Sequence, residues 1–221
     1  MQVPFFPYSD LFMEDEKAYI EIFRSVSSRG AFILQKELED FEELVCEHTK
    51  SKFAIGMGNA TDALEIGLMA GGLKYGNEVI ISSHTMIATA SAIKVAGGNP
   101  VPIECGNDHM MDVNMIESAI TEKTQAIMPT QLNGRVCDMD RIAQIAKKYD
   151  LDIYEDSAQA FGAKYKGKAA GTFGLAGCIS FYPAKTMGCF GDGGVLLLQD
   201  EELYKKAKLI RDHGRNEENK I

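Results

Sequence analysis

Short apolar runs alternate with longer amphipathic runs along most of the chain, and this alternation limits the possible folds more than any other feature. The apolar runs have the length and composition of buried strands, and most are followed by a segment with helical periodicity. The expected strands are residues 53–57, 78–82, 100–104, 125–130 and 151–156, with two further β-type runs at 177–185 and 191–199. Such alternation indicates an α/β fold, so we predict a three-layer α/β/α sandwich with a mainly parallel central sheet.

The remaining periodic segments are expected to form helices. They are residues 60–73, 85–97, 113–120, 138–150 and 201–214, and two charged helices, 14–28 and 35–50, precede the first strand. Asp112 and Asp138 stand at positions typical of N-cap residues. We expect an N-terminal helical arm, residues 1–30, followed by one large domain, residues 31–221.

The composition excludes several classes of partner. The chain has 221 residues, 45% of them apolar, which is enough for a sizeable core, and its net charge of −9 argues against a nucleic acid or an anionic membrane surface as partner. The five cysteines form no C-x-x-C pair, which is typical of a reduced protein. Because we find neither a signal peptide nor an apolar stretch of membrane-spanning length, we expect a cytoplasmic protein.

A small-residue turn joins the first expected strand to the next helix. It contains Asn59, Ala60 and Thr61, whose backbone N–H groups at a helix N-terminus could hold a phosphate, with the Thr61 hydroxyl as a further donor. The alternative is a plain strand-to-helix turn in which Asn59 is the N-cap.

The same segment, residues 56–61, reads G-x-G-x-x-T, which is one step from the dinucleotide-binding fingerprint. That fingerprint requires an acidic residue at the end of the second strand. Here Glu78 begins that strand, and the third glycine is missing. A nicotinamide-dependent dehydrogenase is therefore a weak alternative.

An aspartate ends the expected strand 151–156. Open α/β sheets bind ligands at the carboxyl ends of their strands, so Asp156 can meet a cationic ring nitrogen or a metal. No histidines or carboxylates cluster at ligand spacing, so we expect no metal. The alternative role for Asp156 is that of a cap for the following turn.

A single lysine, Lys185, stands in the apolar and glycine-rich stretch 177–198. A lysine among apolar neighbours can act as a nucleophilic amine, and Ser180, five residues earlier, could hold a phosphate oxygen. The alternative is an exposed lysine in a hairpin. An imine-forming lysine, an acid for a ring nitrogen and an anion cup together match the needs of pyridoxal 5'-phosphate.

The motifs EDSAQAFGAKYKGKAAGTFG (155–174) and SFYPAKTMGCFGDGG (180–194), together with GNATDAL (58–64), carry a family resemblance. The chain resembles the DegT/StrS-type nucleotide-sugar aminotransferases, which have the aspartate-aminotransferase fold (fold type I). The resemblance extends along nearly the whole chain and implies the large cofactor-binding domain of that fold. Family members continue into a small C-terminal domain, which we expect to be absent from this chain.

The resemblance also implies roles for single residues. Lys185 would link covalently to the cofactor and carry a proton between substrate and cofactor, and Asp156 would pair with the pyridinium nitrogen. The other implied cofactor-binding residues are Asn59, Ala60, Thr61, Met86, Gln159 and Ser180. Gln159 would lie near the ring hydroxyl, whereas Met86 replaces an aromatic residue that usually stacks on the ring.

The reaction implied by the resemblance is an amino transfer. An amino acid, expected to be glutamate, would supply the amino group, and a keto group of a nucleotide-linked deoxysugar would receive it. The product would serve surface polysaccharide or lipopolysaccharide synthesis, and the enzyme would be a homodimer. Gln131 and Asn133 replace a histidine and an aromatic residue common in the family, which bears on sugar orientation. The alternative is a regulatory or sensing protein that keeps the fold without turnover.

Overall fold

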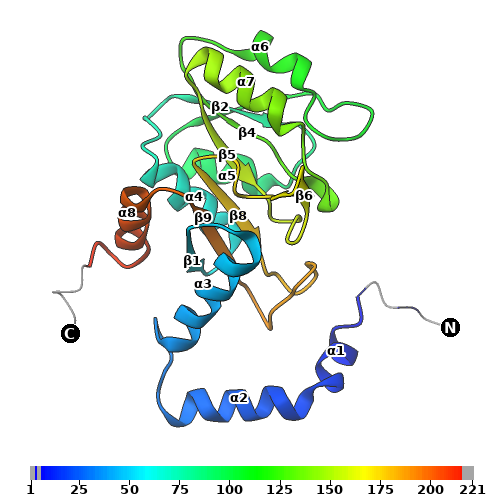
Figure 1. Ribbon diagram of the computed structural model, residues 1–221, viewed down its shortest axis with the longest axis vertical. Coiled ribbons are helices and arrows are strands. Elements are labelled where there is room, and N and C mark those ends of the chain that lie inside the picture. The colour runs from blue at the N-terminus through cyan, green and yellow to red at the C-terminus, as the bar shows by residue number, and fades with distance from the viewer. Residues whose placement is uncertain (1–2, 4–5, 216–221) are drawn as a thin grey trace. The chain divides into compact units, whose positions relative to one another are not determined.

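The computed structural model describes residue 3 and residues 6–215 (Figure 1). Its backbone forms two compact units, one ending at Phe41 and one beginning at Glu42, so the boundary falls inside helix α3 (Lys36–Thr49). In the stretches that the structure describes, no helix combines the length and apolar content needed to cross a membrane.

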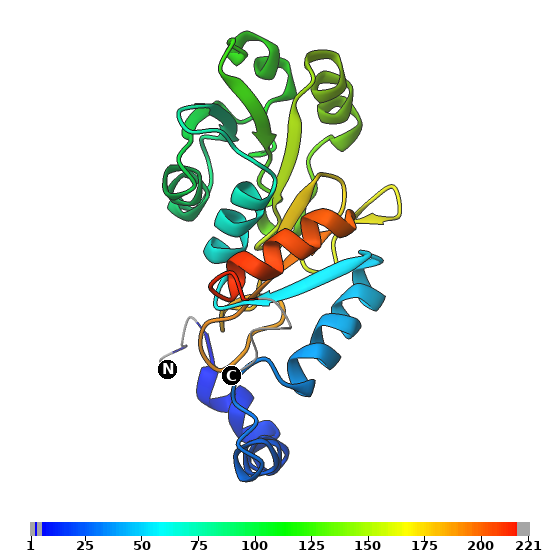
Figure 2. The same ribbon diagram turned by 90° about the vertical axis from the view of Figure 1, so that its left-hand side faces the viewer.

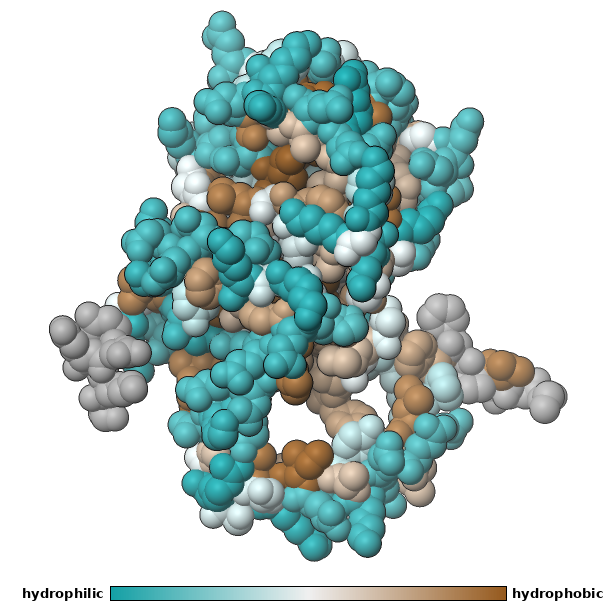
Figure 3. All heavy atoms as spheres, viewed as in Figure 1, coloured by the Kyte–Doolittle hydropathy of each residue, from teal (hydrophilic) through white to brown (hydrophobic). Residues whose placement is uncertain are grey.

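The first unit consists of α1 (Tyr8–Glu14), α2 (Glu16–Ser28) and the first turns of α3. None of its described residues is buried. Ile22 and Phe23 on α2 are 60% and 69% exposed, and apolar side chains are visible on this helix in Figure 3. This unit therefore has no hydrophobic core of its own among the described residues.

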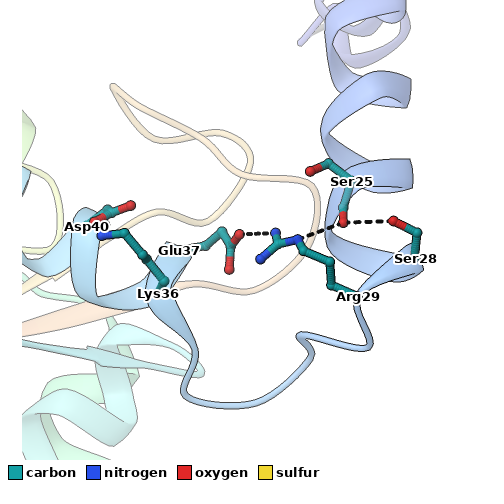
Figure 4. A network of polar contacts seen from close by, with 6 residues as sticks. All are labelled: Ser25, Ser28, Arg29, Lys36, Glu37 and Asp40. Carbon is teal, nitrogen blue, oxygen red and sulfur yellow. Dashed lines mark hydrogen bonds and ion pairs between the residues drawn. The ribbon is translucent and has the colours of Figure 1, made fainter.

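Exposed polar contacts join the end of α2 to the start of α3 (Figure 4). Arg29 forms an ion pair with Glu37 and donates from Nε to the carbonyl of Ser25 at 3.0 Å. Lys36 and Asp40 form a second ion pair, at 2.6 Å, within α3. Such exposed pairs contribute little to stability because water and salt screen them.

The second unit is built on a seven-stranded sheet. Its strands are β1 (Phe53–Met57), β2 (Glu78–Ser82), β3 (Asn99–Ile103), β4 (Thr124–Met128), β5 (Asp152–Asp156), β8 (Ala176–Ser180) and β9 (Gly194–Leu198). They follow the order β1-β9-β8-β5-β4-β2-β3. The pairs β2–β3, β2–β4, β4–β5 and β5–β8 are parallel, whereas β9 runs antiparallel to both β8 and β1. The prediction of a mainly parallel sheet is confirmed.

Helices cover both faces of this sheet (Figure 2). They are α4 (Ala60–Ala70), α5 (Ile87–Val95), α6 (Ile116–Ala119), α7 (Met139–Tyr149) and α8 (Glu201–Arg211), with short 3-10 turns at Val113–Met115 and Leu132–Gly134. One core cluster packs α4, α5 and α8 against the sheet, and a second packs α6 and α7 against it. The predicted three-layer sandwich is therefore confirmed.

Local sequence signals explain several of the boundaries. Asp112 and Asp138 are N-caps as expected, since their side chains accept hydrogen bonds from the backbone N–H of Asn114 and Arg141. The expected helix 113–120 is instead a 3-10 turn followed by one turn of α6.

The sequence did not predict the small hairpin of β6 (Lys164–Tyr165) and β7 (Lys168–Ala169). Its strands are too short and too charged to show a β pattern. Its turn uses Lys166 and Gly167 at φ values of 50° and 85°, the left-handed geometry that tight hairpins require.

The alternation of side chains along β5 positions the site. Tyr154 belongs to the core under α4 and α5, whereas Ile153 packs against the core under α7. Because successive side chains in a strand point to opposite faces, Asp156 points to the same face as Tyr154, and Glu155 points to the same face as Ile153. The two neighbouring carboxylates therefore face different layers of the fold.

Candidate active site

A cavity of ≈ 640 Å³ opens at the edge of the sheet where the parallel strands end. It is formed by the segments that follow β1, β2, β4, β5 and β8 and by the residues just before the antiparallel β9. All eight residues singled out from the sequence line it, namely Asn59, Ala60, Thr61, Met86, Asp156, Gln159, Ser180 and Lys185. The structure thus brings Asn59 and Lys185, which are 126 positions apart in the sequence, into one cavity.

The N-terminus of α4 forms one wall of this cavity. Asn59 is its N-cap and accepts a hydrogen bond from the backbone N–H of Asp62 at 2.9 Å. Among the described residues, the N–H groups of Ala60 and Thr61 have no hydrogen-bond partner, as is usual in the first turn of a helix. The cap expected from the sequence is therefore present, and it leaves two donors for an anion.

Gly194 allows β9 to approach this helix N-terminus closely. A Cβ atom at Gly194 would lie 2.4 Å from the carbonyl carbon of Asn59 and 2.6 Å from the nitrogen of Ala60. Any larger residue would therefore displace the backbone that carries the two free donors.

Ser180 and Lys185 lie at and after the end of β8. Ser180 Oγ accepts a hydrogen bond from the N–H of Tyr182 at 3.2 Å, so its own proton is free to be donated. Lys185 is half-buried, and no described residue forms an ion pair or a hydrogen bond with its ammonium group. A cation without a partner among these residues is available to a bound molecule.

Asp156 is 4% exposed and is held by three donors. Its Oδ2 accepts from the hydroxyl of Thr89 at 2.5 Å, and its Oδ1 accepts from the N–H of Ala158 at 3.3 Å and from the thiol of Cys178 at 3.6 Å. The bond from Ala158 is the local turn contact expected of a capping aspartate, so that alternative is correct in part. A carboxylate has about four acceptor positions, which leaves capacity on the cavity side.

Gln159 and Met86 occupy further parts of the wall. The side-chain oxygen of Gln159 accepts from the N–H of Asn133 at 3.0 Å, which leaves its amide nitrogen to donate. Met86 precedes α5 and is 63% exposed, so its thioether side chain is available for packing against a flat group.

Glu155 has a different environment from its neighbour. It is fully buried and accepts from Nε2 of Gln131 at 2.9 Å and from the N–H groups of Gly171, Phe173 and Gly174 at 3.0, 2.6 and 3.1 Å. Burial raises the pKa of the Glu155 carboxyl, and these four donors act in the opposite direction.

Gln131 does not line the cavity. It is fully buried, bonds to Glu155, and accepts from the N–H of Cys137 at 2.7 Å. Gln131 stands where the resemblance leads one to expect a histidine, and it packs on the face of the sheet opposite to Asp156.

The acid required for dinucleotide binding is engaged elsewhere. Glu78 accepts hydrogen bonds from Thr121 at 2.5 Å and Thr124 at 3.3 Å, at the amino end of β2. The cavity lies at the opposite, carboxyl end of that strand. This geometry removes the support for a nicotinamide site.

Sequence reasoning missed several lining residues, above all Thr85 and Thr130. Thr85 and Thr89 are four positions apart at the start of the expected helix 85–97. The i, i+4 spacing of these two hydroxyls is a signal that could have identified Thr85, whereas no local signal points to Thr130.

Comparison with known proteins identifies the family of the chain. The family model of the DegT/DnrJ/EryC1/StrS aminotransferases matches residues 13–221. The chain is 38% identical over 208 residues to dTDP-3-amino-3,4,6-trideoxy-alpha-D-glucose transaminase of Streptomyces venezuelae, covering 94% of this chain and 54% of that protein. It is 39% identical over 215 residues to a Geobacillus stearothermophilus protein named "Pleiotropic regulatory protein", covering 97% of this chain and 58% of that protein.

The fold is also shared with solved structures. The crystal structure of S. venezuelae DesV in complex with a ketimine intermediate superposes with a TM-score of 0.94 and 36% identity, covering 99% of this chain and 59% of that one. The chain thus spans less than two thirds of the length of these relatives. With a family model that matches nearly its whole length, the chain belongs to the DegT/DnrJ/EryC1/StrS aminotransferase family.

Proposed function

We propose that the chain is part of a pyridoxal 5'-phosphate-dependent aminotransferase that moves an amino group from an amino acid to a keto group of a nucleotide-linked deoxysugar. One observation carries the proposal. A half-buried lysine, a buried aspartate and a helix N-terminus with two free N–H donors share one cavity, although they come from distant parts of the sequence.

The donors of the cavity fit the cofactor. The N–H groups of Ala60 and Thr61, with the Ser180 hydroxyl, form an anion cup for the phosphate. The remaining acceptor capacity of Asp156 suits a protonated ring nitrogen. When bound, pyridoxal phosphate supplies an electron sink for a carbanion on the substrate.

The residues of the chain have distinct proposed tasks. Lys185 would hold the cofactor through its Nζ atom and, once released, would move the proton from the carbon of the amino donor to the cofactor carbon, and in the second half of the reaction from the cofactor carbon to the carbon of the keto sugar. Asp156 holds a proton on the ring nitrogen. Asn59 shapes the phosphate cup, Gln159 donates to the ring hydroxyl and Met86 packs against the ring.

The substrate assignment rests on the relatives and on the charge of the cavity. The S. venezuelae relative is named as a transaminase of a dTDP-linked amino sugar. Among the described residues, Lys185 is the one cationic side chain in the lining. The carboxylate of an amino donor, proposed to be glutamate, and the phosphates of a nucleotide therefore need cations from outside this cavity, for which we propose a homodimer.

The cellular setting is part of the same proposal. We propose a cytoplasmic enzyme whose product enters surface polysaccharide or lipopolysaccharide synthesis, in which residues 1–30 form an arm and residues 31–221 the cofactor-binding domain. All five cysteines are free, as suits a reducing compartment.

The second candidate is a regulatory protein that keeps the fold without turnover. It is favoured only by the names of some relatives, such as that of the G. stearothermophilus protein. The residues of the cavity argue against it, because a binding module needs no lysine free for covalent chemistry.

Turnover separates the two candidates. The chain loaded with pyridoxal phosphate is mixed with glutamate and with a keto-sugar nucleotide, and the amino sugar is followed by mass spectrometry. We expect product from the wild type and none from Lys185→Ala. Cofactor uptake without product, in the full-length protein as well as in this chain, would favour the regulatory candidate.

A further inference from the structure

Three threonine hydroxyls form a chain from the cavity wall to Asp156. Oγ1 of Thr130 lies 2.8 Å from Oγ1 of Thr85, which lies 2.7 Å from Oγ1 of Thr89. Thr89 Oγ1 lies 2.5 Å from Oδ2 of Asp156. Thr85 and Thr130 line the cavity after β2 and β4, while Thr89 belongs to the first turn of α5.

The direction of these hydrogen bonds follows from the number of protons. A threonine hydroxyl has one proton to donate, and a carboxylate has none. Thr89 gives its proton to Asp156, so it must accept from Thr85. Thr85 must then accept from Thr130, whose proton is committed to the chain. Successive hydroxyl bonds of one direction polarise and strengthen one another.

Thr89 lies behind the cavity wall, and its hydroxyl donates to Asp156, which lines the cavity. It is fully buried and is not among the residues that line the cavity. Its bond is also the shortest of the three that hold the carboxylate, the other two being 3.3 and 3.6 Å long. Because rotation about the bond to a carboxyl group has broad minima, this hydroxyl is the firmest restraint on the carboxylate plane.

We propose that Thr89 is a positioning residue, which with Thr85 and Thr130 fixes the orientation in which Asp156 presents its remaining lone pairs to the cavity. The identity of the group that Asp156 meets rests on the proposed function. The orientation itself is a property of this chain and can be measured without the cofactor.

The test compares four single variants with the wild type, of which Thr130→Val is used in the second readout only. Thr89→Val keeps the shape and removes the hydroxyl, and Thr89→Ser restores the hydroxyl. Thr172→Val is the matched control, because Thr172 is also buried and donates to the backbone carbonyl of Ala169 at 2.7 Å, away from the cavity. If Thr89→Val does not fold, Thr89→Ala removes the same hydroxyl without adding bulk.

The first readout is the crystal structure of each variant at Thr89 or Thr172. We expect the Asp156 carboxylate to turn by more than about 30° in Thr89→Val and to stay in place in Thr89→Ser and Thr172→Val. An unmoved carboxylate in Thr89→Val overturns the proposal, whatever happens to activity.

The second readout is the half-reaction of the pyridoxal phosphate form at saturating glutamate. We expect Thr89→Val to lower the maximal rate about tenfold, which corresponds to the loss of one hydrogen bond, with a smaller change in KM. The maximal rate of Thr89→Ser should be within about threefold of the wild-type rate. The rate of Thr130→Val, at the far end of the threonine chain, should fall less than that of Thr89→Val. An equal loss in Thr172→Val would overturn the positioning role. Failure of the wild type to take up pyridoxal phosphate would instead refute the proposed function, and the crystal structures would still decide the role of Thr89.

Discussion

Glu155 and Asp156 are adjacent carboxylates at the end of β5, and they lie on opposite faces of the sheet. Glu155 lies on the side of α6 and α7, where four donors of its own chain bond to it. Asp156 lies on the side of α4 and α5. Three donors bond to its carboxylate, which is otherwise open to the cavity. A period of two along the strand is enough to separate them.

The comparison teaches how to tell a structural carboxylate from a functional one. A buried carboxylate whose acceptor positions are all used within the chain fastens a loop, here residues 171–174, to the sheet. A carboxylate with acceptor capacity left on a cavity can hold a ligand. Matched changes at the two positions should therefore affect different properties.

Glu155→Gln should have the largest effect, and the effect should be on stability. Each oxygen of Glu155 accepts two N–H donors, so an amide NH₂ in either orientation faces two donors. We expect the free energy of unfolding to fall by about 3–4 kcal/mol, as measured by urea denaturation. A loss below about 1 kcal/mol would mean that the loop is held by other contacts.

Asp156→Asn should change stability little and lower the rate of the reaction strongly. The threonine hydroxyls can reverse their bonds to accept from the new amide, so the unfolding free energy should change by less than about 1 kcal/mol. Without the carboxylate charge, the half-reaction with glutamate should slow about 10²-fold, while the affinity for pyridoxal phosphate falls much less because the phosphate cup is intact. Equal losses in rate and affinity would show that Asp156 is a structural cap.

Two glycines allow the same comparison at the backbone. A Cβ at Gly177 would lie 2.3 Å from the carbonyl oxygen of Gly171, beside the Glu155 loop, and a Cβ at Gly194 would press on Asn59. Both Gly→Ala changes should destabilise the fold by about 1–3 kcal/mol. Gly194→Ala alone should also weaken pyridoxal phosphate binding, by about tenfold, because it displaces a phosphate donor. Titration of cofactor absorbance measures this, and equal weakening by Gly177→Ala would remove the distinction.

The smallest expected effect is the difference in thiol reactivity between the native and the unfolded chain at the buried cysteines Cys137 and Cys178. Burial raises the pKa of the Cys137 thiol, on the Glu155 side, to about 12, and also raises the pKa of Cys178, beside Asp156. The fold thus favours both protonated thiols, and the stability that the Cys137 thiol contributes is lost as pH rises from 9.0 toward about 12. At about pH 8, where an unshifted thiol is partly ionised, we expect iodoacetamide to label both cysteines in urea and neither in the native chain. Peptide mapping shows which cysteine is labelled. Labelling of Cys137 or Cys178 in the native chain would contradict this expectation and would show that the face of the sheet around that cysteine opens to solvent.

Much of the fold was predictable because it depends on local pattern. The apolar runs 53–57 and 78–82 coincide with β1 and β2, and the expected caps Asp112 and Asp138 are confirmed. The antiparallel direction of β9 was not predictable, because it depends on which neighbours the strand meets.

The site was predictable where a residue type is itself unusual. A lysine in an apolar stretch and an aspartate at a strand end identified Lys185 and Asp156, and both line the cavity. The threonine chain was not found, because Thr130 is 45 positions from Thr85 and only the fold brings them within 2.8 Å. Likewise, strand alternation places Glu155 and Asp156 on opposite faces, but it does not show which of them keeps free acceptor positions, because most of their donors, such as Thr89 and Gly171, are distant in the sequence.

The central claim, that this cavity holds pyridoxal phosphate on Lys185, has one most direct test. The chain is incubated with pyridoxal phosphate, reduced with borohydride, digested, and mapped by mass spectrometry. We predict one cofactor adduct, on the peptide that contains Lys185, and its loss in Lys185→Ala. An adduct mainly on Lys164, which is exposed on the β6–β7 hairpin outside the cavity, would contradict the account.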